Sequence, residues 1–227
     1  MINSLKNKLI TTIKASESLL NFVAATYSFG TVLRTKGRKK NSIKYTGSML
    51  KNTSIQINGS NNSIFIAPKN RLINCKITII GTNCKLYIEN NCTLKNLELW
   101  LEDNGSEIFI GNTSSMEGGH IAATEGESIK IGNDCMFSHR IEIRSGDSHS
   151  IYQKDSDKRI NNAKPVVIGS HVWLGADAKI LKGAVIIGGA VIATGAVVTG
   201  VVEANSIYAG NPAKKVKENI YWDRERK

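Results

Sequence analysis

His149 is the residue that most clearly could do chemistry, and it lies in the polar, turn-prone stretch "RSGDSHSIY" (144–152). Nothing around it is apolar enough to form a core, so the ring is either solvated or part of a site. A histidine titrates near neutrality and is suited to take a proton from a hydroxyl group. Asp147 stands two residues earlier. It either fixes the tautomer of the imidazole or is an ordinary turn residue, and the sequence leaves both open.

A strict six-residue repeat predicts the scaffold that holds this stretch. Every sixth position is aliphatic, and the residue four places after each is small or β-branched. The aliphatic set is Ile168, Leu174, Ile180, Ile186, Ile192 and Val198, and the second set is Val172, Ala178, Ala184, Ala190, Ala196 and Val202. Six-residue repeats are typical of a β-helix. Three such repeats make one triangular coil of about 18 residues, and coils stack about 4.8 Å apart.

The repeat becomes longer toward the N-terminus. Similar segments begin at positions 63, 85 and 107, which is a period of 22 residues. They bring three aromatic residues into register, namely Phe65, Tyr87 and Phe109. We interpret these segments as 18-residue coils with small insertions at the corners. The repeat therefore predicts a prism over residues 50–210.

One interruption of the repeat contains the histidine. The repeats that start at 131, 137 and 143 end at Ser148, and the next starts at Ile168. Residues 149–167 are therefore predicted to form a loop that leaves one corner of the prism. Long loops on rigid scaffolds are usually functional or disordered. His149 opens the loop, where the scaffold can hold a catalytic group.

The charge of the chain is concentrated near its N-terminus. Of a formal net charge of +11, residues 1–45 contribute +8, from nine Lys or Arg and one Glu. The basic run "RTKGRKK" (34–40) either contacts an anionic surface or is a solvated linker. We expect no nucleic-acid partner, and we keep peripheral membrane contact as an expectation.

Three segments are expected. Helical spacing of apolar residues predicts a helix or helix pair over 2–29, which either caps the first coil or touches a membrane, with capping favoured. It belongs to a basic segment at 1–45, followed by the β-helix at 46–215. Residues 216–227 are predicted to form a short C-terminal helix.

The sequence contains no membrane-spanning segment, no secretory signal and no paired cysteine motif. No stretch reaches the roughly 18 uncharged apolar residues of a membrane helix, and we see no secretory signal, so a cytoplasmic protein is expected. The four cysteines form no C-x-x-C pair. Buried free thiols are therefore favoured.

Three motifs carry a resemblance to a known family. They are "VVIGSHVWLGADAKILKGAVIIGGAVIATGAVVTGVV" (166–202), "IYAGNPAKKV" (207–216), and "SGDSHSIY" taken together with "HVWLG". The chain resembles the hexapeptide-repeat acyltransferases, and most of all the bacterial polysialic acid O-acetyltransferases. The resemblance implies an all-β, left-handed parallel β-helix. It also implies acetyl-CoA-dependent acetylation of sugar hydroxyls on a capsular or surface polysaccharide.

The resemblance also implies roles for individual residues. His149 would be the general base, acting by direct transfer. Trp173 would line the acetyl-CoA tunnel and help to position the acetyl group, although a corner aromatic that packs against another subunit is the alternative. Arg144 and Arg159 would meet an acidic glycan. Coenzyme contacts are expected from Gly175, Ala176, Ala193, Gly195, Tyr208, Lys214 and Lys215.

The register of the repeat places His149 and Trp173 at different corners of one prism. If they share a site, two chains meet there or the loop folds back. We therefore expect a homotrimer with sites between neighbouring prisms, as is usual in the resembled family.

The other histidines point to no further site. His171 and His139 are expected to face outward, with His171 exposed and inert, and His120 to lie in a lower coil near the same groove. β-Helix carbonic anhydrases hold zinc with two histidines five residues apart plus a third, a spacing that this sequence lacks. No metal site is expected.

Two other functions remain open from the sequence. The nearer one is an acyltransferase acting on a small nucleotide sugar, an amino sugar or serine, because the fold does not determine the substrate. The other is a β-helix that binds without catalysis, and it predicts no affinity for CoA.

Overall fold

The structure is a computed structural model that describes residues 17–36 and 40–225. The expected helix over 2–29 is described only in part, as α2 (Glu17–Tyr27). Residues 2–16 of that prediction lie outside the described residues. Within the described ranges, no helix is long and apolar enough to cross a membrane.

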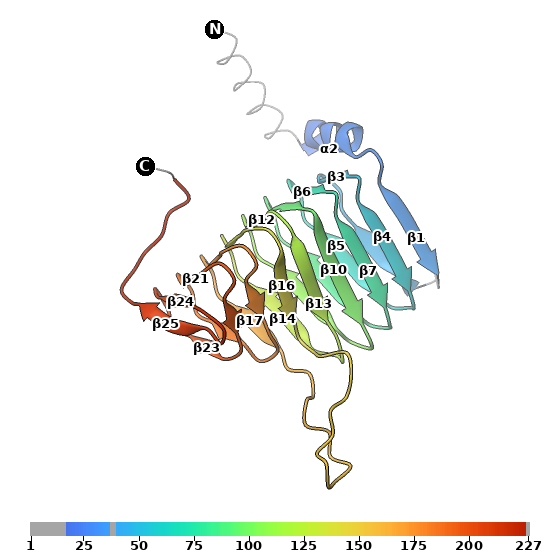
Figure 1. Ribbon diagram of the computed structural model, residues 1–227. Helices are drawn as coiled ribbons and strands as arrows, with labels where there is room; N and C mark the ends of the chain where they lie inside the picture. Colours follow the sequence, from blue (N-terminus) through green and yellow to red (C-terminus); the bar gives the residue numbers. More distant parts are fainter. Residues whose placement is uncertain (1–16, 37–39, 226–227) are drawn as a thin grey trace.

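Three sheets of parallel strands form the faces of a triangular column (Figure 1). Face A contains β1 (Val32–Lys36), β4 (Ser54–Asn58), β7 (Lys76–Ile80), β10 (Leu97–Glu102), β13 (Gly119–Ala123), β16 (Ile141–Arg144), β19 (Lys179–Ile180) and β22 (Val197–Val198). Face B contains β2 (Ser42–Lys44), β5 (Ser63–Ile66), β8 (Lys85–Ile88), β11 (Glu107–Ile110), β14 (Ser128–Ile131), β17 (Val166–Ile168), β20 (Val185–Ile186) and β23 (Val201–Val202).

Face C is the third sheet. It contains β3 (Met49–Lys51), β6 (Arg71–Ile73), β9 (Thr93–Lys95), β12 (Ser115–Met116), β15 (Met136–Phe137), β18 (Trp173–Leu174), β21 (Val191–Ile192), β24 (Ile207–Ala209) and β25 (Lys214–Lys217). Each strand pairs with the third strand along the chain, so the chain visits faces A, B and C once per coil. The predicted all-β parallel solenoid is confirmed.

The predicted repeat positions fill the interior of the column. All twelve aliphatic and small residues of the repeat between Ile168 and Val202 are buried, and none exposes more than 2% of its surface. Interiors packed this tightly respond to the loss of even one methylene group. The six-residue period therefore marks the side chains that pack inside each coil.

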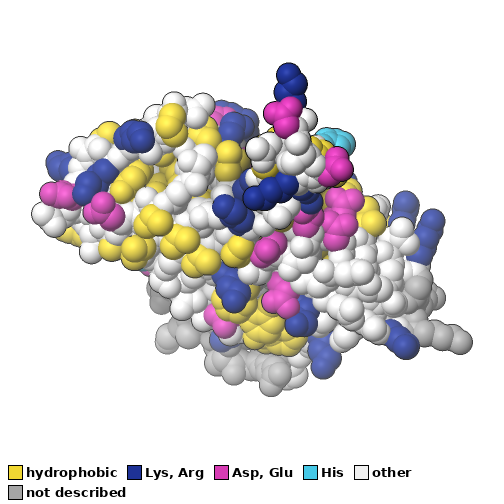
Figure 2. All heavy atoms as spheres, turned by 90° about the horizontal axis from the view of Figure 1, so that it is seen from below, with side chains coloured by type: hydrophobic (Ala, Val, Ile, Leu, Met, Phe, Trp, Pro, Cys, Tyr) yellow, Lys and Arg dark blue, Asp and Glu magenta, His cyan; other side chains and the backbone are white. Residues whose placement is uncertain are grey.

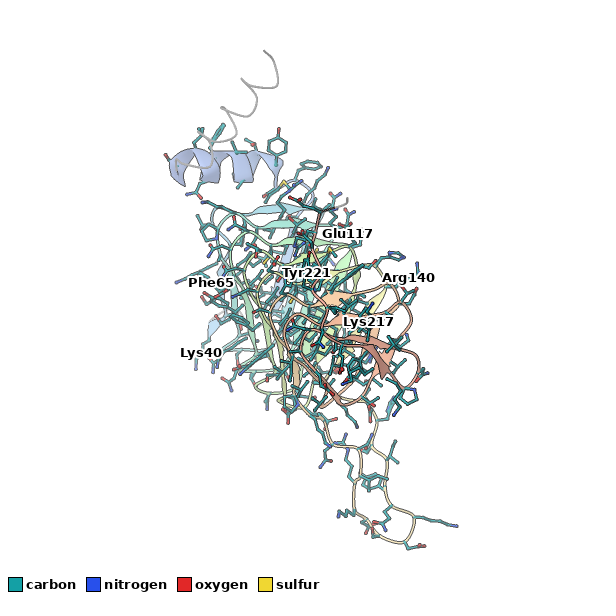
Figure 3. All side chains as sticks on the ribbon, turned by 90° about the vertical axis from the view of Figure 1, so that its left-hand side faces the viewer. Lys40, Phe65, Glu117, Arg140, Lys217 and Tyr221 are labelled. Atoms are coloured by element: carbon teal, nitrogen blue, oxygen red, sulfur yellow. The ribbon has the colours of Figure 1, made fainter. Side chains whose placement is uncertain are left out.

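The longer coils near the N-terminus stack with the predicted period of 22 residues. Tyr87 pairs in register with Phe65 on one side and Phe109 on the other. The ring centroids lie 4.9 and 5.4 Å apart in a stacked ladder on the outside of face B. Figure 3, which looks along the column, shows Phe65 on the opposite side from Arg140.

Asparagines occupy the widened corners of these coils. Asn52 and Asn74 have φ angles of 49° and 55°, a left-handed conformation that asparagine tolerates better than most residues. Each donates a side-chain hydrogen bond to the asparagine one coil further on, and the last acceptor is Asn96. The ladder explains how a coil can exceed 18 residues without losing its register.

The column begins earlier than the repeat predicts. β1 starts at Val32 and pairs in parallel with β4, whereas the prediction placed the first coil near residue 50. A terminal coil is covered on one side only, and Leu33 on β1 is accordingly 49% exposed. Its sequence therefore carries no strict aliphatic repeat. α2 lies beside β3 on the side of the column (Figure 1).

The predicted C-terminal helix is wrong. Lys214–Lys217 form the edge strand β25, antiparallel to β24, and no helix follows in residues 218–225. Asn219 takes a positive φ of 57°, which is incompatible with a continuing helix. The tail instead folds back onto the earlier coils, where Arg224 donates to the Asp134 carboxylate at 2.8 Å and to the Cys135 carbonyl at 2.9 Å.

We expect Leu99→Ala to lower the free energy of unfolding by about 2–5 kcal/mol, because it leaves a cavity in a dry interior. Leu99 is fully buried and pairs with Ile77 and Ile121 in the neighbouring coils. Lys130→Ala, which removes an exposed side chain from face B, is the control and should change stability little. Urea unfolding followed by circular dichroism measures both. Equal effects of the two substitutions would contradict this account of the core.

Candidate active site

The predicted loop leaves the corner between faces A and B, after β16, and projects from the column (Figure 1). Its tip is closed by an antiparallel bridge between Tyr152 and Arg159. β16 ends at Arg144 and β17 begins at Val166, so the loop spans residues 145–165 and both starts and ends earlier than the predicted 149–167. His149 is exposed near the start of the loop, next to the rigid coil.

Asn161 fixes the backbone at His149. Its side-chain amide donates to the His149 carbonyl at 2.7 Å and to the Asp147 carboxylate at 3.0 Å, and its oxygen accepts from the Ile151 nitrogen at 2.7 Å. Asn161 is only 7% exposed. The sequence analysis missed this residue, because nothing in "RINNAKP" separates it from an ordinary turn asparagine such as Asn162.

Asp147 anchors the loop to the next coil. Its carboxylate accepts a hydrogen bond from Lys182, and the same ammonium donates to the Asn161 carbonyl at 2.8 Å. The hydrogen bond from Lys182 holds the pKa of the Asp147 carboxyl below its usual range. Of the two roles left open by the sequence, these contacts favour the structural one, since no hydrogen bond within the described ranges joins this carboxylate to the His149 ring.

The two predicted substrate-binding arginines lie in different surroundings. Arg159 donates to both carboxylate oxygens of Glu125, at 2.7 and 2.6 Å, and lowers the pKa of that glutamate. Arg144 lies on the outside of face A, where its Nε donates to Glu142. The His120 ring also contacts Glu142, with Nδ1 3.1 Å from Oε1. Arg144 and His120 line one groove together with Ser148, as predicted for His120.

Burial raises the pKa of the Glu142 carboxyl, but the hydrogen bonds from His120 and Arg144 outweigh it and hold the pKa below its usual range. Glu142 is therefore ionised at neutral pH.

Trp173 lies on face C, where it is 38% exposed. Its ring centroid is 6.0 Å from that of Trp222 in the C-terminal tail, with the planes tilted by 51°. The indole of Trp222 donates to the His171 carbonyl at 2.9 Å. The tail thus borders the tryptophan that the resemblance assigns to the coenzyme.

His171 is half-buried and has partners, whereas the prediction made it exposed; that it is inert stays a prediction. Its Nδ1 lies 2.7 Å from the Asp134 carboxylate, its Nε2 lies 3.0 Å from the Trp222 carbonyl, and its ring stacks on Trp222 with centroids 3.9 Å apart. The register does turn the ring outward. The repeat could not indicate that the tail returns to cover it.

The four small residues predicted to contact the coenzyme occupy one corner, between faces C and A. Gly175 and Ala176 lie one coil below Ala193 and Gly195, and the Gly195 nitrogen donates to the Ala176 carbonyl at 2.8 Å. A Cβ atom on Gly175 would lie 2.7 Å from the Thr194 nitrogen, so glycine is required for this close approach.

The remaining predicted coenzyme contacts line a separate hollow. Tyr208, Lys214 and Lys215 border a pocket of about 420 Å³ at the last coils. Lys215 is ion-paired with Glu203 at 2.9 Å and Glu218 at 3.0 Å, and the hydrogen bond that it donates to Glu203 is the largest cause of its raised pKa. Lys214 and Lys215 therefore both border the pocket, and Lys215 is ion-paired with two carboxylates.

His149 and Trp173 flank the two opposite edges of face A. The loop leaves from the corner between faces A and B, whereas Trp173 precedes the corner between faces C and A. A face is about six residues wide, which is about 20 Å at ~3.3 Å per residue. The prediction of different corners is confirmed, and the two side chains do not meet on the surface of one column.

The cysteines behave as predicted. Cys75, Cys84, Cys92 and Cys135 are buried and free. Burial raises the pKa of the Cys92 and Cys135 thiols to about 11. Such thiols are poor nucleophiles at neutral pH. Among the residues that the structure describes, no group of three or more His, Cys, Asp or Glu side chains could hold a metal ion.

Known proteins share this architecture. No protein-family model matches the chain. A polysialic acid O-acetyltransferase of Neisseria meningitidis is 38% identical over 181 residues, which cover 79% of this chain and 84% of the relative. The solved structure of the polysialic acid O-acetyltransferase OatWY superposes with a TM-score of 0.75 at 32% identity, covering 88% of this chain and 90% of that one.

A second relative is more similar over a shorter stretch. The polysialic acid O-acetyltransferase of Escherichia coli O1:K1 / APEC is 46% identical over 120 residues, which are 53% of this chain and 39% of the relative. The chain thus matches about two fifths of that protein's length. A three-faced parallel solenoid with one long loop defines the hexapeptide-repeat class. Within it, the chain belongs to the family of the polysialic acid O-acetyltransferases.

We expect Lys182→Met to raise the pKa of Asp147 toward the usual value of about 3.9. Because folding lowers the pKa of Asp147, its carboxylate stabilises the base of the loop at every pH above the usual pKa. This contribution is lost as the pH falls through the lowered pKa of the folded protein. Carbon NMR of the Asp147 carboxyl group measures the titration. Lys179→Met, three residues away on an exposed position, is the control and should leave it unchanged. An Asp147 titration that is the same in wild type and Lys182→Met would contradict the anchoring role.

Proposed function

We propose that the chain is an acetyl-CoA-dependent O-acetyltransferase that acetylates sugar hydroxyls of an acidic surface polysaccharide, with polysialic acid as the acceptor. The observation that carries this proposal is the placement of His149. His149 is exposed near the start of an anchored loop and follows Ser148, which lines the groove that contains Arg144. Similarity to two enzymes named polysialic acid O-acetyltransferases supports the choice of acceptor.

His149 would act as the general base. Its imidazole takes the proton of the sugar hydroxyl as that oxygen attacks the thioester carbonyl carbon, and the new C–O bond forms without a covalent enzyme intermediate. Backbone N–H groups near the bound acetyl group would stabilise the oxyanion. When the C–S bond breaks, the imidazolium returns the proton to the leaving sulfur. The buried cysteines take no part.

Trp173 would border the acetyl-bearing end of the coenzyme. The corner formed by Gly175, Ala176, Ala193 and Gly195 lies next to it and would accept the pantetheine arm against the backbone. Further along the column, Tyr208, Lys214 and Lys215 would receive the adenine and the 3′-phosphate in the hollow that they line. Arg144 would pair with a carboxylate of the acceptor, whereas the bidentate pairing of Arg159 with Glu125 favours a role in holding the loop.

We infer a homotrimer with the active sites between subunits, and a left-handed coil as in the resembled family. One distance supports the trimer: His149 cannot reach Trp173 of the same chain across a face of about 20 Å, whereas the loop projects away from its own column. Face B also exposes apolar residues on its last coils, among them Val185 and Val201. Figure 2 shows hydrophobic side chains gathered over these C-terminal coils. Such a patch is typical of a subunit contact.

Acetyl-CoA would place the reaction in the cytoplasm. The basic run at 34–40 and the exposed Phe22 and Tyr27 of α2 are suited to peripheral contact with an anionic membrane, where surface glycans are assembled.

We expect His149→Ala to lower the rate of acetyl transfer to polysialic acid by about 10²–10⁴-fold, the usual contribution of a general base. CoA affinity, measured by calorimetry, should stay within a factor of two, because among the described residues the hydrogen bonds of His149 involve its backbone and not its ring. His139→Ala is the matched control, since His139 is another exposed histidine, on the turn before β16. Near-normal turnover of His149→Ala would contradict the role of base.

We expect two inactive variants to restore activity when they are mixed. In trimers assembled at random from His149→Ala and Trp173→Ala chains, about a quarter of the intersubunit sites combine both native residues. Co-expression followed by the transfer assay measures the recovery, and light scattering should give three times the 24.8 kDa chain mass. An active monomer, or mixtures as inactive as the separate variants, would contradict sites between subunits.

A further inference from the structure

A groove of about 320 Å³ lies on the outside of face A, directly beside the start of the loop. Its lining comes from three successive coils and includes Trp100, Glu102, His120, Thr124, Arg144 and Ser148. Ser148 precedes His149, so one end of the groove reaches the proposed general base. In Figure 3 this face lies between the projecting loop and Arg140.

Trp100 forms the aromatic part of the groove. It points outward from β10, is half-buried, and donates its indole N–H to the Glu102 carboxylate at 3.1 Å. Its neighbours in register are Thr78 and Ala122, which are short and buried. Lys76 Nζ lies over the indole ring, 5.9 Å from its centroid, so the short neighbours leave room for a flat sugar ring only on the face away from Lys76. An indole face stacked on the C–H side of a sugar ring buries apolar surface without losing the sugar's hydroxyl contacts.

Two cationic or donor groups face the same groove in fixed positions. Arg144 uses its Nε and His120 uses its Nδ1 to contact a single oxygen of Glu142. The structure records no bond to a described residue for the terminal Nη atoms of Arg144 or for Nε2 of His120. Both side chains are partly exposed. Arg144 therefore offers its planar donor fork to a carboxylate while Glu142 prevents it from moving.

A buried hydroxyl group lies beneath the loop base at one end of the groove. Thr124 is 8% exposed, and its Oγ1 has no hydrogen-bond partner among the described residues. A Cβ atom on Gly146 would lie 2.4 Å from this oxygen, so the glycine allows the loop base to pass directly over it. Buried hydroxyls are nearly always hydrogen-bonded in folded proteins, but the loop base leaves this oxygen no accessible surface, so Thr124 shapes the end of the groove and is not a ligand contact.

We propose that this groove is a subsite for a second sugar residue of the acidic glycan, next to the residue that is acetylated. Trp100 stacks on the sugar ring, and Arg144 pairs with its carboxylate. The inference rests on the proposed function and extends it, because it assigns acceptor recognition to a surface of one chain, away from the coenzyme corner.

The charges in the groove distinguish this ligand from a nucleotide sugar. Glu98 and Glu102 line the same groove and can accept hydrogen bonds from sugar hydroxyls. Glu98 is already ion-paired with Lys76 at 2.8 Å, and Arg144 is the one Lys or Arg among the described lining residues, so the groove can balance one carboxylate but not the two charges of a diphosphate. The groove therefore favours a carboxylated glycan over a nucleotide-linked donor.

The test is a calorimetric titration of the full chain with α2,8-linked oligosialic acid, in the His149→Ala background so that no transfer occurs. Adding Trp100→Ala should weaken binding at least tenfold. Adding Tyr87→Ala, which removes an exposed aromatic from face B, should leave binding unchanged. Adding Arg144→Gln should weaken binding of oligosialic acid but not of the same oligomer with its carboxyl groups reduced.

Two results would overturn the subsite: equal binding by the Trp100→Ala and Tyr87→Ala chains with unchanged melting temperatures, or no binding of oligosialic acid by any of them. The proposed function is tested separately by measuring acetyl transfer with chains that keep His149, namely the wild type and the Trp100→Ala variant. Transfer with an unchanged glycan KM in Trp100→Ala would remove the subsite and leave the enzyme. Binding that depends on Trp100 without any transfer would keep the subsite and remove the enzyme.

Discussion

The stacking of identical coils in register is the constraint on which the rest of the structure depends. Backbone hydrogen bonds join neighbouring coils only when the coils stack in register. That stacking brings side chains such as Leu174 and Ala178 to fixed positions inside the column, where the packed interior accepts only apolar residues. A column built in this way has rigid faces and sharp corners. It cannot close around a substrate, so any site must form on a face, at a corner or against a second column.

This geometry explains how the parts of the candidate site are divided. The corner between faces A and B releases the loop with His149, and a buried network around Asn161 and Lys182 holds the first residues of that loop in place. The proposed coenzyme elements lie along the other edge of face A, near Trp173 and the folded-back tail. The proposed acceptor groove occupies face A beside the loop. Each proposed function thus uses a separate element of one rigid column, and in the proposed trimer catalysis would require two columns to meet.

The sequence predicted those features that depend on the repeat. The parallel solenoid, the buried hexad residues, the aromatic ladder through Tyr87 and the position of the loop all follow from a period that packing enforces. Features outside the period were missed. β1 lacks the aliphatic pattern because a terminal coil is covered on one side only, and the tail that covers His171 makes contacts across 51 residues of sequence.

The roles of single polar side chains could not be predicted from the sequence either. Asn161 and Thr124 matter because of what surrounds them in space, and neither differs in sequence from many ordinary loop or strand residues.

The most direct test of the central claim is a crystal structure of the assembled protein with CoA bound. The account predicts that the coenzyme sulfur lies beside Trp173 of one copy. It also predicts that His149 of the neighbouring copy lies close enough for a sugar hydroxyl to fit between its ring and the sulfur. A sulfur atom enclosed by His149 and Trp173 of the same chain, or bound far from any copy of His149, would contradict it.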